Sequence, residues 1–206
     1  VIRKQLTQIS IEAPYGSKTK LYLPDGTLVW LNAGSKMSYA QDFGINERAL
    51  NLTGEAYFEV AHDTQKPFVV STEDMSIRVL GTKFNVKAYA EDEAVYTTLV
   101  SGSVRTNNKQ STYSTLLSPN EQCIYYPGNN RMETRKIDPQ TFLGWVQGRF
   151  IFENETLEEI LKQLGRWYDT EIFYQNPRVA KYRFTGNVDR FDQISTLLHM
   201  IEKTYP

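Results

Sequence analysis

Residues 54–60 alternate strictly between hydrophobic and polar positions. Beyond Gly54, one face of an extended strand receives Ala56, Phe58 and Val60, and the other receives Glu55, Tyr57 and Glu59. Because strand side chains repeat every two residues, this pattern predicts a half-buried strand entered through a glycine bend. The two carboxylates invite a catalytic interpretation, but no acid, base or metal ligand accompanies them nearby. We therefore expect the second face to be solvated.

Short apolar runs separated by turn signals continue to about residue 130. Pro24-Asp25-Gly26 between residues 20–23 and 27–32 predicts a hairpin, since proline presets φ and glycine accepts a positive φ. A weaker alternation predicts an entry strand within residues 1–13. No helical period interrupts the series. We therefore expect an all-β domain over residues 1–138, either sandwich-like or solenoid-like, because irregular glycine spacing leaves its winding open.

The pattern changes after residue 138. Residues 145–152 predict a strand, and Thr156 with Glu159 then forms the capping-box pattern of a helix start. Apolar residues at helical spacing follow in 157–167 and again in 194–201, and two further strands are expected at 171–174 and 182–188. The order β-α-β-β-α makes residues 139–206 a small α+β domain of a mainly β protein. A following strand usually completes such a unit, so we expect this domain to be truncated at its end or completed by something else, with an open sheet edge.

Composition and charge exclude several classes of function. The 206 residues carry 23 Lys and Arg against 24 Asp and Glu, a net charge of −1, so no basic field attracts nucleic acid or anionic lipid. The single cysteine, Cys123, excludes an internal disulfide. No apolar run approaches the ~20 residues that cross a bilayer. The 26 aromatic residues favour strands.

The residues that could carry chemistry are isolated from one another. His62 and His199 lie in different expected domains without metal-ligand spacing, and Cys123 lacks a CxxC companion. Ser101-Gly102-Ser103 lacks the flanks of a nucleophile elbow, and no phosphate-binding glycine loop occurs. We therefore predict no catalytic, cofactor-binding or metal site, and a binding or signalling module rather than an enzyme.

Five motifs in order and in register carry a family resemblance. They are Leu23-Pro24-Asp25-Gly26-Thr27 with Val29-Trp30-Leu31-Asn32, Gly54-Glu55-Ala56-Tyr57-Phe58-Glu59-Val60, Pro67-Phe68-Val69-Val70, Val79-Leu80-Gly81-Thr82 with Phe84-Asn85-Val86, and Leu99-Val100-Ser101-Gly102-Ser103-Val104. Over residues 15–130 the chain resembles the FecR family of anti-sigma factors. Residues 148–186 look like the C-terminal domain that follows FecR domains, which is similar to the STN (secretin/TonB short N-terminal) signalling fold.

The resemblance implies a signal-receiving periplasmic region of a single-pass inner-membrane anti-sigma factor. In that family, the N-terminal signalling domain of an outer-membrane TonB-dependent transporter delivers the signal. A cytoplasmic segment, absent from these residues, binds an extracytoplasmic-function (ECF) sigma factor. The resemblance therefore implies protein partners, no cofactor and no nucleic acid, and places the transmembrane span outside this chain.

The aromatic residues of the α+β domain are the expected partner contacts. The transporter's signalling domain would add to the sheet edge or bind an aromatic patch. The candidate contacts are Trp145, Phe150, Ile151, Phe152, Phe173 and Tyr174. The alternative is a carbohydrate-binding or glycan-sensing module, which predicts a row of exposed aromatic residues near Tyr57, Tyr89 or Tyr96. A hydrolase would need two carboxylates facing each other across a cleft, which the sequence does not indicate.

Overall fold

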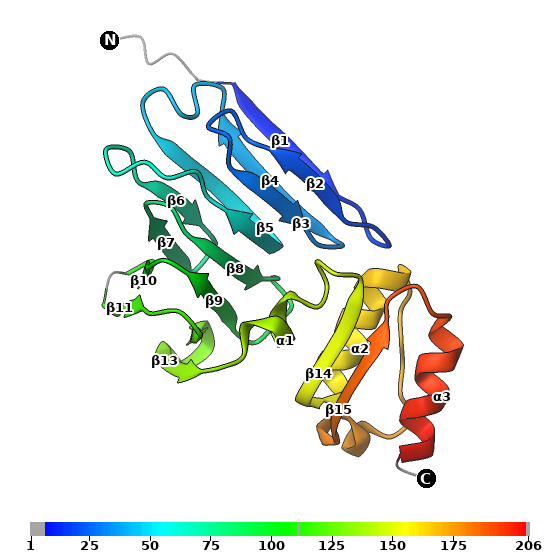
Figure 1. Ribbon diagram of the computed structural model, residues 1–206. Coiled ribbons are helices and arrows are strands. Elements are labelled where there is room, and N and C mark those ends of the chain that lie inside the picture. The colour runs from blue at the N-terminus through cyan, green and yellow to red at the C-terminus, as the bar shows by residue number, and fades with distance from the viewer. Residues whose placement is uncertain (1–6, 111, 205–206) are drawn as a thin grey trace.

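The computed structural model describes residues 7–110 and 112–204. Thirteen strands form one hydrogen-bonded network that ends at Lys136, and a smaller unit of two strands and two longer helices lies beside it (Figure 1). The strands of the network are β1 (Gln8–Ala13), β2 (Thr19–Tyr22), β3 (Leu28–Leu31), β4 (Ser35–Ala40), β5 (Arg48–Glu59), β6 (Phe68–Ser71), β7 (Met75–Val79), β8 (Lys83–Ala88), β9 (Val95–Ser101), β10 (Val104–Asn108), β11 (Ser114–Leu117), β12 (Glu121–Tyr126) and β13 (Arg131–Lys136), with a 3₁₀ turn η1 (Pro127–Asn129) before the last strand.

Strand β5 belongs to two sheets at once. Its first half pairs with β4 and β6, and its second half pairs with β3 and β8. One sheet therefore runs β1-β4-β5-β6-β7-β10-β11, and the other runs β2-β3-β5-β8-β9-β12-β13. Gly54 lies where the strand passes from one sheet to the other, with a φ of +96°. A Cβ at this position would lie 2.5 Å from Ser35 Oγ, so the bend requires glycine.

The main hydrophobic core lies between the two sheets. Rings from opposite sheets meet there, with Phe58 and Phe68 centroids 5.8 Å apart, and Thr106 Oγ1 lies 3.6 Å from Cys123 Sγ. The mainly β fold class is therefore confirmed, and the sandwich-like alternative describes the winding. We call β1–β13 the sandwich. The predicted hairpin is also present, since Gly26 has a φ of +84° and Leu23 N–H donates to the carbonyl of Thr27 at 2.9 Å.

The C-terminal unit, defined here as residues 149–206, has its own core. Its described elements are β14 (Arg149–Thr156), α2 (Leu157–Tyr168), a 3₁₀ turn η2 (Pro177–Lys181), β15 (Arg183–Asp189) and α3 (Ile194–Thr204); the short helix α1 (Pro139–Leu143) precedes them. Strands β14 and β15 pair antiparallel, and the apolar face of α2 packs on them. The predicted capping box is present, with Glu159 N–H donating to Thr156 Oγ1 at 3.3 Å.

One predicted strand is absent, and another starts later than predicted. Residues 171–174 form no strand, because no described strand lies beside them and Phe173 points to solvent with 84% of its surface exposed. The strand expected at 145–152 starts only at Arg149, because residues 144–148 form hydrogen-bonded turns. The described order is thus β-α-β-α. The first six residues of the expected entry strand, and the end expected to be truncated, fall outside the described residues.

Candidate functional site

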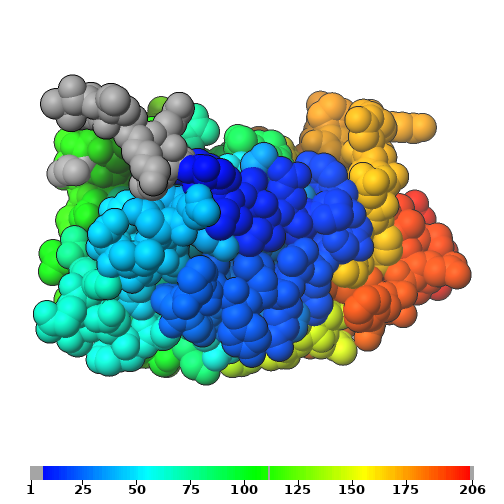
Figure 2. Space-filling view, turned by 90° about the horizontal axis from the view of Figure 1, so that it is seen from above, coloured from blue at the N-terminus to red at the C-terminus, as the bar shows by residue number. Residues whose placement is uncertain are grey.

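The sandwich and the C-terminal unit meet along one surface, which we call the seam. Figure 2 shows the N-terminal strands of the sandwich (blue) directly beside the C-terminal unit (orange). On the sandwich side, the seam is the outward face of the sheet that contains β3, β5, β8, β9, β12 and β13. The two main cores stay separate, and among the described residues Ala33 is the only sandwich member of the C-terminal core.

A row of polar side chains crosses the outward face of this sheet. Directly opposed residues form it, with Asn85 beside Thr98, Thr98 beside Gln122 and Gln122 beside Arg135. Gln122 donates to Thr98 Oγ1 at 2.8 Å and accepts from the Arg135 guanidinium at 2.8 and 3.0 Å. Asn85, Thr98 and Gln122 are all buried, so this polar face of the sheet is enclosed and internally hydrogen-bonded.

Glu55 sits at the centre of the seam, and the sequence prediction for it is wrong. The side chain is only 8% exposed, and Tyr57 on the same face is 7% exposed, so this face is not in water. The carboxylate accepts from Asn32 Nδ2 at 2.7 Å and from Asn85 Nδ2 at 2.9 Å. Burial is tolerated because both oxygens receive hydrogen bonds, and chain beyond residue 138 covers the face.

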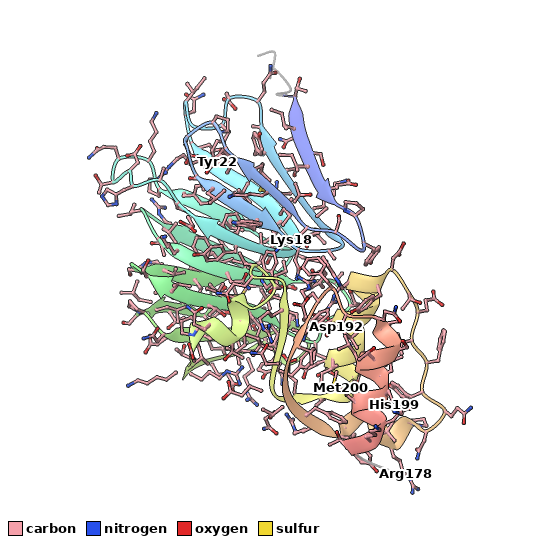
Figure 3. All side chains as sticks on the ribbon, turned by 45° about the vertical axis from the view of Figure 1, so that its right-hand side comes forward. Lys18, Tyr22, Arg178, Asp192, His199 and Met200 are labelled. Carbon is pink, nitrogen blue, oxygen red and sulfur yellow. The ribbon has the colours of Figure 1, made fainter. Side chains whose placement is uncertain are left out.

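The segment just after the sandwich closes over this face. Leu143 and Trp145 pack on Tyr57 in a small third hydrophobic cluster, and Trp145 Nε1–H donates to Asn85 Oδ1 at 3.3 Å. From the sandwich, Lys18 Nζ donates to the carbonyl of Val146 at 2.6 Å, and Figure 3 shows Lys18 where the two parts meet. Residues 143–146 therefore contact the sandwich, although Gly144 also lies against Ile151 of β14.

Arg190, which follows β15, reaches across the seam. Its guanidinium stacks between Trp167 and Phe150, 3.9 and 4.9 Å from their ring centroids. It donates to Asn32 Oδ1 at 3.0 Å, although its Nε–H has no hydrogen-bond partner among the described residues. Arg190 is only 2% exposed and forms no ion pair among the described residues. Burial therefore lowers its pKa to about 10.

Arg166 on α2 makes the ionic contact of the seam. Its guanidinium donates to Glu91 Oε1 at 2.7 Å and to Asp92 Oδ1 at 3.1 Å, both in the loop between β8 and β9. The same group stacks 3.8 Å from the ring centroid of Tyr89. Burial opposes the charge of Arg166, but Asp92, Tyr89 and Glu91 together raise its pKa above the ordinary value, so the contact favours the ionised pair.

A cavity of about 700 Å³ lies between the two parts along the seam. Sandwich residues Lys87, Tyr96 and Thr98 line one wall, and Glu155, Glu159 and Gln163 line the opposite wall. Glu155 accepts from Gln163 Nε2 at 2.9 Å. Burial raises the pKa of Glu155 to about 7, Lys87 lowers it and Glu159 raises it. The cavity is therefore polar and carries a carboxyl group that titrates near neutrality.

The six predicted contact residues do not form one surface. Trp145, Phe150 and Phe152 are buried at 7%, 3% and 7% exposure, and the latter two belong to the C-terminal core. Ile151 is half-buried against Gly144. Phe173 and Tyr174 are exposed, at 84% and 36%. The buried three are packing residues in this structure: the two aromatic rings of β14 share the face that α2 covers, and Trp145 packs on Tyr57.

Sequence reasoning missed the charged residues of the seam. Arg166 lies one position before the last apolar residue of the α2 stripe, and Arg190 follows a strand that ends in polar residues. Neither position stands out by pattern, because their partners are distant in sequence. The one available signal was Glu55 with Asn85, polar residues on strands otherwise rich in apolar ones.

Among the described residues, the three tyrosines that mark the row expected for a glycan-binding module are buried or half-buried. Tyr57 and Tyr89 are each 7% exposed, and Tyr96 is half-buried in the cavity with Lys87 Nζ 5.5 Å from its ring centroid. The faces of these rings are covered by other residues of the protein and are not open to a sugar. Within the described ranges, no group of three or more His, Cys, Asp or Glu residues is arranged to hold a metal ion.

Comparison with known proteins identifies the family. Residues 9–105 match the family described as FecR protein, and residues 149–206 match the family described as FecR, C-terminal. A crystal structure of a candidate anti-sigma factor from Parabacteroides distasonis superposes with a TM-score of 0.89 at 32% identity, covering 96% of this chain and 92% of the other. A second structure with that description gives a TM-score of 0.88 at 32% identity, covering 97% and 92%.

The chain belongs to the FecR family of anti-sigma factors. A search of curated proteins found no match. Membership of the FecR family indicates a regulatory role and interaction with a sigma factor. No helix among the described residues is long and apolar enough to cross a membrane.

Proposed function

We propose that this FecR-family chain is the periplasmic, signal-receiving region of a membrane-anchored anti-sigma factor. In this role its C-terminal unit, an STN-like domain, binds the N-terminal signalling domain of a TonB-dependent outer-membrane transporter. The signal then passes through protein contacts to an ECF sigma factor, which a cytoplasmic segment outside these residues would bind. Membership of the FecR family is the observation that carries this proposal.

The surface of the C-terminal unit supports a docking role. Five large apolar side chains of this small unit are substantially exposed: Phe173, Tyr174, Tyr182, Phe191 and Met200. Met200 lies on α3, well away from the seam (Figure 3). In addition, β14 and β15 form a sheet of only two strands in the described residues, which leaves strand edges for pairing with a partner. Exposed apolar groups and open edges together typify a protein-binding surface.

Calorimetric titration of this chain with the signalling domain of the transporter encoded beside it tests the proposal. We expect binding, and we expect Phe173→Ala to weaken it about fivefold or more, because an aromatic anchor at the centre of an interface contributes about 1 kcal/mol or more. Tyr22→Ala is the matched control. Tyr22 is 68% exposed on β2 in the sandwich (Figure 3), and its removal should leave affinity unchanged.

Two results would count against this assignment. If the wild-type chain shows no heat even where a ~100 μM contact would register, the transporter domain is not the partner. If Tyr22→Ala weakens binding and Phe173→Ala does not, the docking surface lies on the sandwich.

A further inference from the structure

We propose that the C-terminal unit opens and closes on the sandwich as one body, pivoting at Gly148 and held shut by Arg166, with the ionised carboxylate of Glu155 opposing closure. This inference concerns two parts of the same chain and does not depend on which partner docks.

The seam is built from separable contacts. Its long-range bonds come mainly from cationic side chains: Arg166 and Lys162 reach Glu91, Arg190 reaches Asn32, and Lys18 reaches the chain just before the unit. The two hydrophobic cores lie on either side of it, so opening leaves the sandwich core covered and removes only Ala33, among the described residues, from the second core. The cavity of about 700 Å³ also means that the two parts are not close-packed along the seam.

Gly148 is the covalent crossing point between the two parts. Trp145 and Val146 are fastened to the sandwich through the third cluster and Lys18, and β14 begins at Arg149 in the second core. Opening must also break bonds that join the two sides of Gly148, since Arg190 donates to the carbonyl of Trp145 at 3.3 Å and Arg149 N–H donates to that of Gly144 at 2.9 Å. Gly148 has a φ of +81°, a conformation that side-chain-bearing residues rarely adopt. A glycine between two fastened segments is where a rotation of one body relative to the other costs least. We therefore place the domain boundary here rather than at residue 138.

Arg166 holds the closed state together because its contacts cross the seam and favour its charged form. Its partners Glu91, Asp92 and Tyr89 all lie in or beside one loop of the sandwich. The backbone carbonyl of Arg166 also accepts from Gly16 N–H at 3.0 Å, which fastens the end of α2 to the sandwich a second time. Arg190 adds less, because on opening it would keep its stacking on Trp167 and gain hydration.

Glu155 faces the cavity without an ion pair among the described residues. Lys87 on β8 is the cation that lowers its pKa, but Lys87 Nζ is paired with Asp92 Oδ2 at 3.3 Å. Glu159 on α2 and Glu55 on β5 raise its pKa, and Glu155 in turn raises the pKa of Tyr96 on β9. The ionisable groups Lys136, Glu153, Arg166 and Arg190 also line the cavity. Arg135, Arg149 and Arg183 line the same cavity but donate to Gln122, Asn187 and the carbonyl of Asn154.

The sign of the pH effect follows from this environment. Glu155 is half-buried in the cavity that closure forms, and in this closed state its pKa is raised to about 7 from 4.5. Closure is therefore fully favoured, as far as Glu155 is concerned, below pH 4.5, and this contribution is lost as pH rises through about 7. Lys87 and Arg166 lower the pKa of Asp92 although burial opposes them. The ion pair of Arg166 with Asp92 therefore stays ionised between pH 4.5 and about 7.

Spin-label distances on the whole chain test the proposal. One label replaces the exposed residue Asn51 on the sandwich and the other replaces exposed Ser195 on α3, with buried Cys123 changed to alanine throughout. We expect a long-distance population whose ratio to the short one rises about tenfold between about pH 5 and about pH 7.5. That is the change produced when one pKa unit of the Glu155 shift depends on closure.

Two matched pairs of variants separate the hinge from general unfolding. Glu155→Gln should abolish the pH dependence and leave the short distance, whereas Glu153→Gln, an exposed carboxylate on the same strand, should preserve it. Arg166→Met should raise the open population about tenfold at every pH. Arg183→Met should not raise it, because exposed Arg183 donates within its own unit.

Three outcomes would overturn the proposal. They are a single distance at every pH in the wild-type chain, a pH dependence that survives Glu155→Gln, and an Arg166→Met variant whose new population lacks the α2 hydrogen-exchange protection of a folded unit. The last result would mean that the unit unfolds rather than opens.

Discussion

At the scale of single residues, Glu55 shows how context changes the meaning of a pattern. Alternation correctly assigned it to the face opposite Ala56 and Phe58. A strand face rich in polar groups is normally exposed to solvent. Here that face is covered by Trp145 and the residues around it, which lie about ninety positions further along the chain. The alternation predicts which residues share a face, but it carries no information on what covers that face.

Replacing Glu55 with alanine should destabilise the sandwich by about 2–4 kcal/mol, because two buried amide donors, Asn32 Nδ2 and Asn85 Nδ2, lose their acceptor. Denaturant unfolding measures this change. Glu59→Ala is the control on the same strand: Glu59 pairs with Lys83 at the partly exposed end of β5, and its loss should cost under about 1 kcal/mol. Equal losses in the two variants would show that the buried carboxylate has no special role.

Local chemistry was predictable, and distant pairing was not. The capping box of Thr156 and Glu159, and the turn at Gly26, follow from a few neighbouring residues, so the sequence contains all the information they need. Arg166 and Arg190 acquire their roles from partners 74 and 158 residues away in the sequence. No spacing rule links such residues, and only the folded chain brings them together.

At the scale of elements, β5 depends on the bend at Gly54. Gly54→Ala should destabilise the protein by about 2–4 kcal/mol, because the new Cβ would meet Ser35 at 2.5–2.8 Å while the backbone stays at positive φ. Thermal unfolding measures the loss. Gly128→Ala is the matched control, since a Cβ there meets nothing within 4 Å, and it should change stability by under about 0.5 kcal/mol. A stable Gly54→Ala protein would refute the close approach.

The missing strand at residues 171–174 has a physical explanation. The sequence Glu171-Ile172-Phe173-Tyr174 favours extended structure, but a strand also needs a neighbour to pair with. The described chain provides none at this position, and only Ile172 of the four packs against the second core. Intrinsic preference thus indicates which segments are able to pair, whereas pairing itself depends on the tertiary arrangement.

At the scale of the whole molecule, two separate cores predict two unfolding transitions. The C-terminal unit has the smaller core and should unfold first, with hydrogen-exchange protection lost in α2 while β5 and β8 stay protected. Arg166→Met should lower the first transition and leave the second unchanged. A single cooperative transition in the wild-type chain, with both regions losing protection together, would mean that the seam couples the two cores tightly.

During synthesis, which starts at the N-terminus, strand β5 also determines the order in which the sandwich can be completed. Strands β1–β4 precede it, yet β3 and β4 each keep one side unpaired until β5 arrives to join them. Neither layer can therefore mature ahead of the other. Up to that moment both layers present open edges, and one bent strand then closes two of them at once.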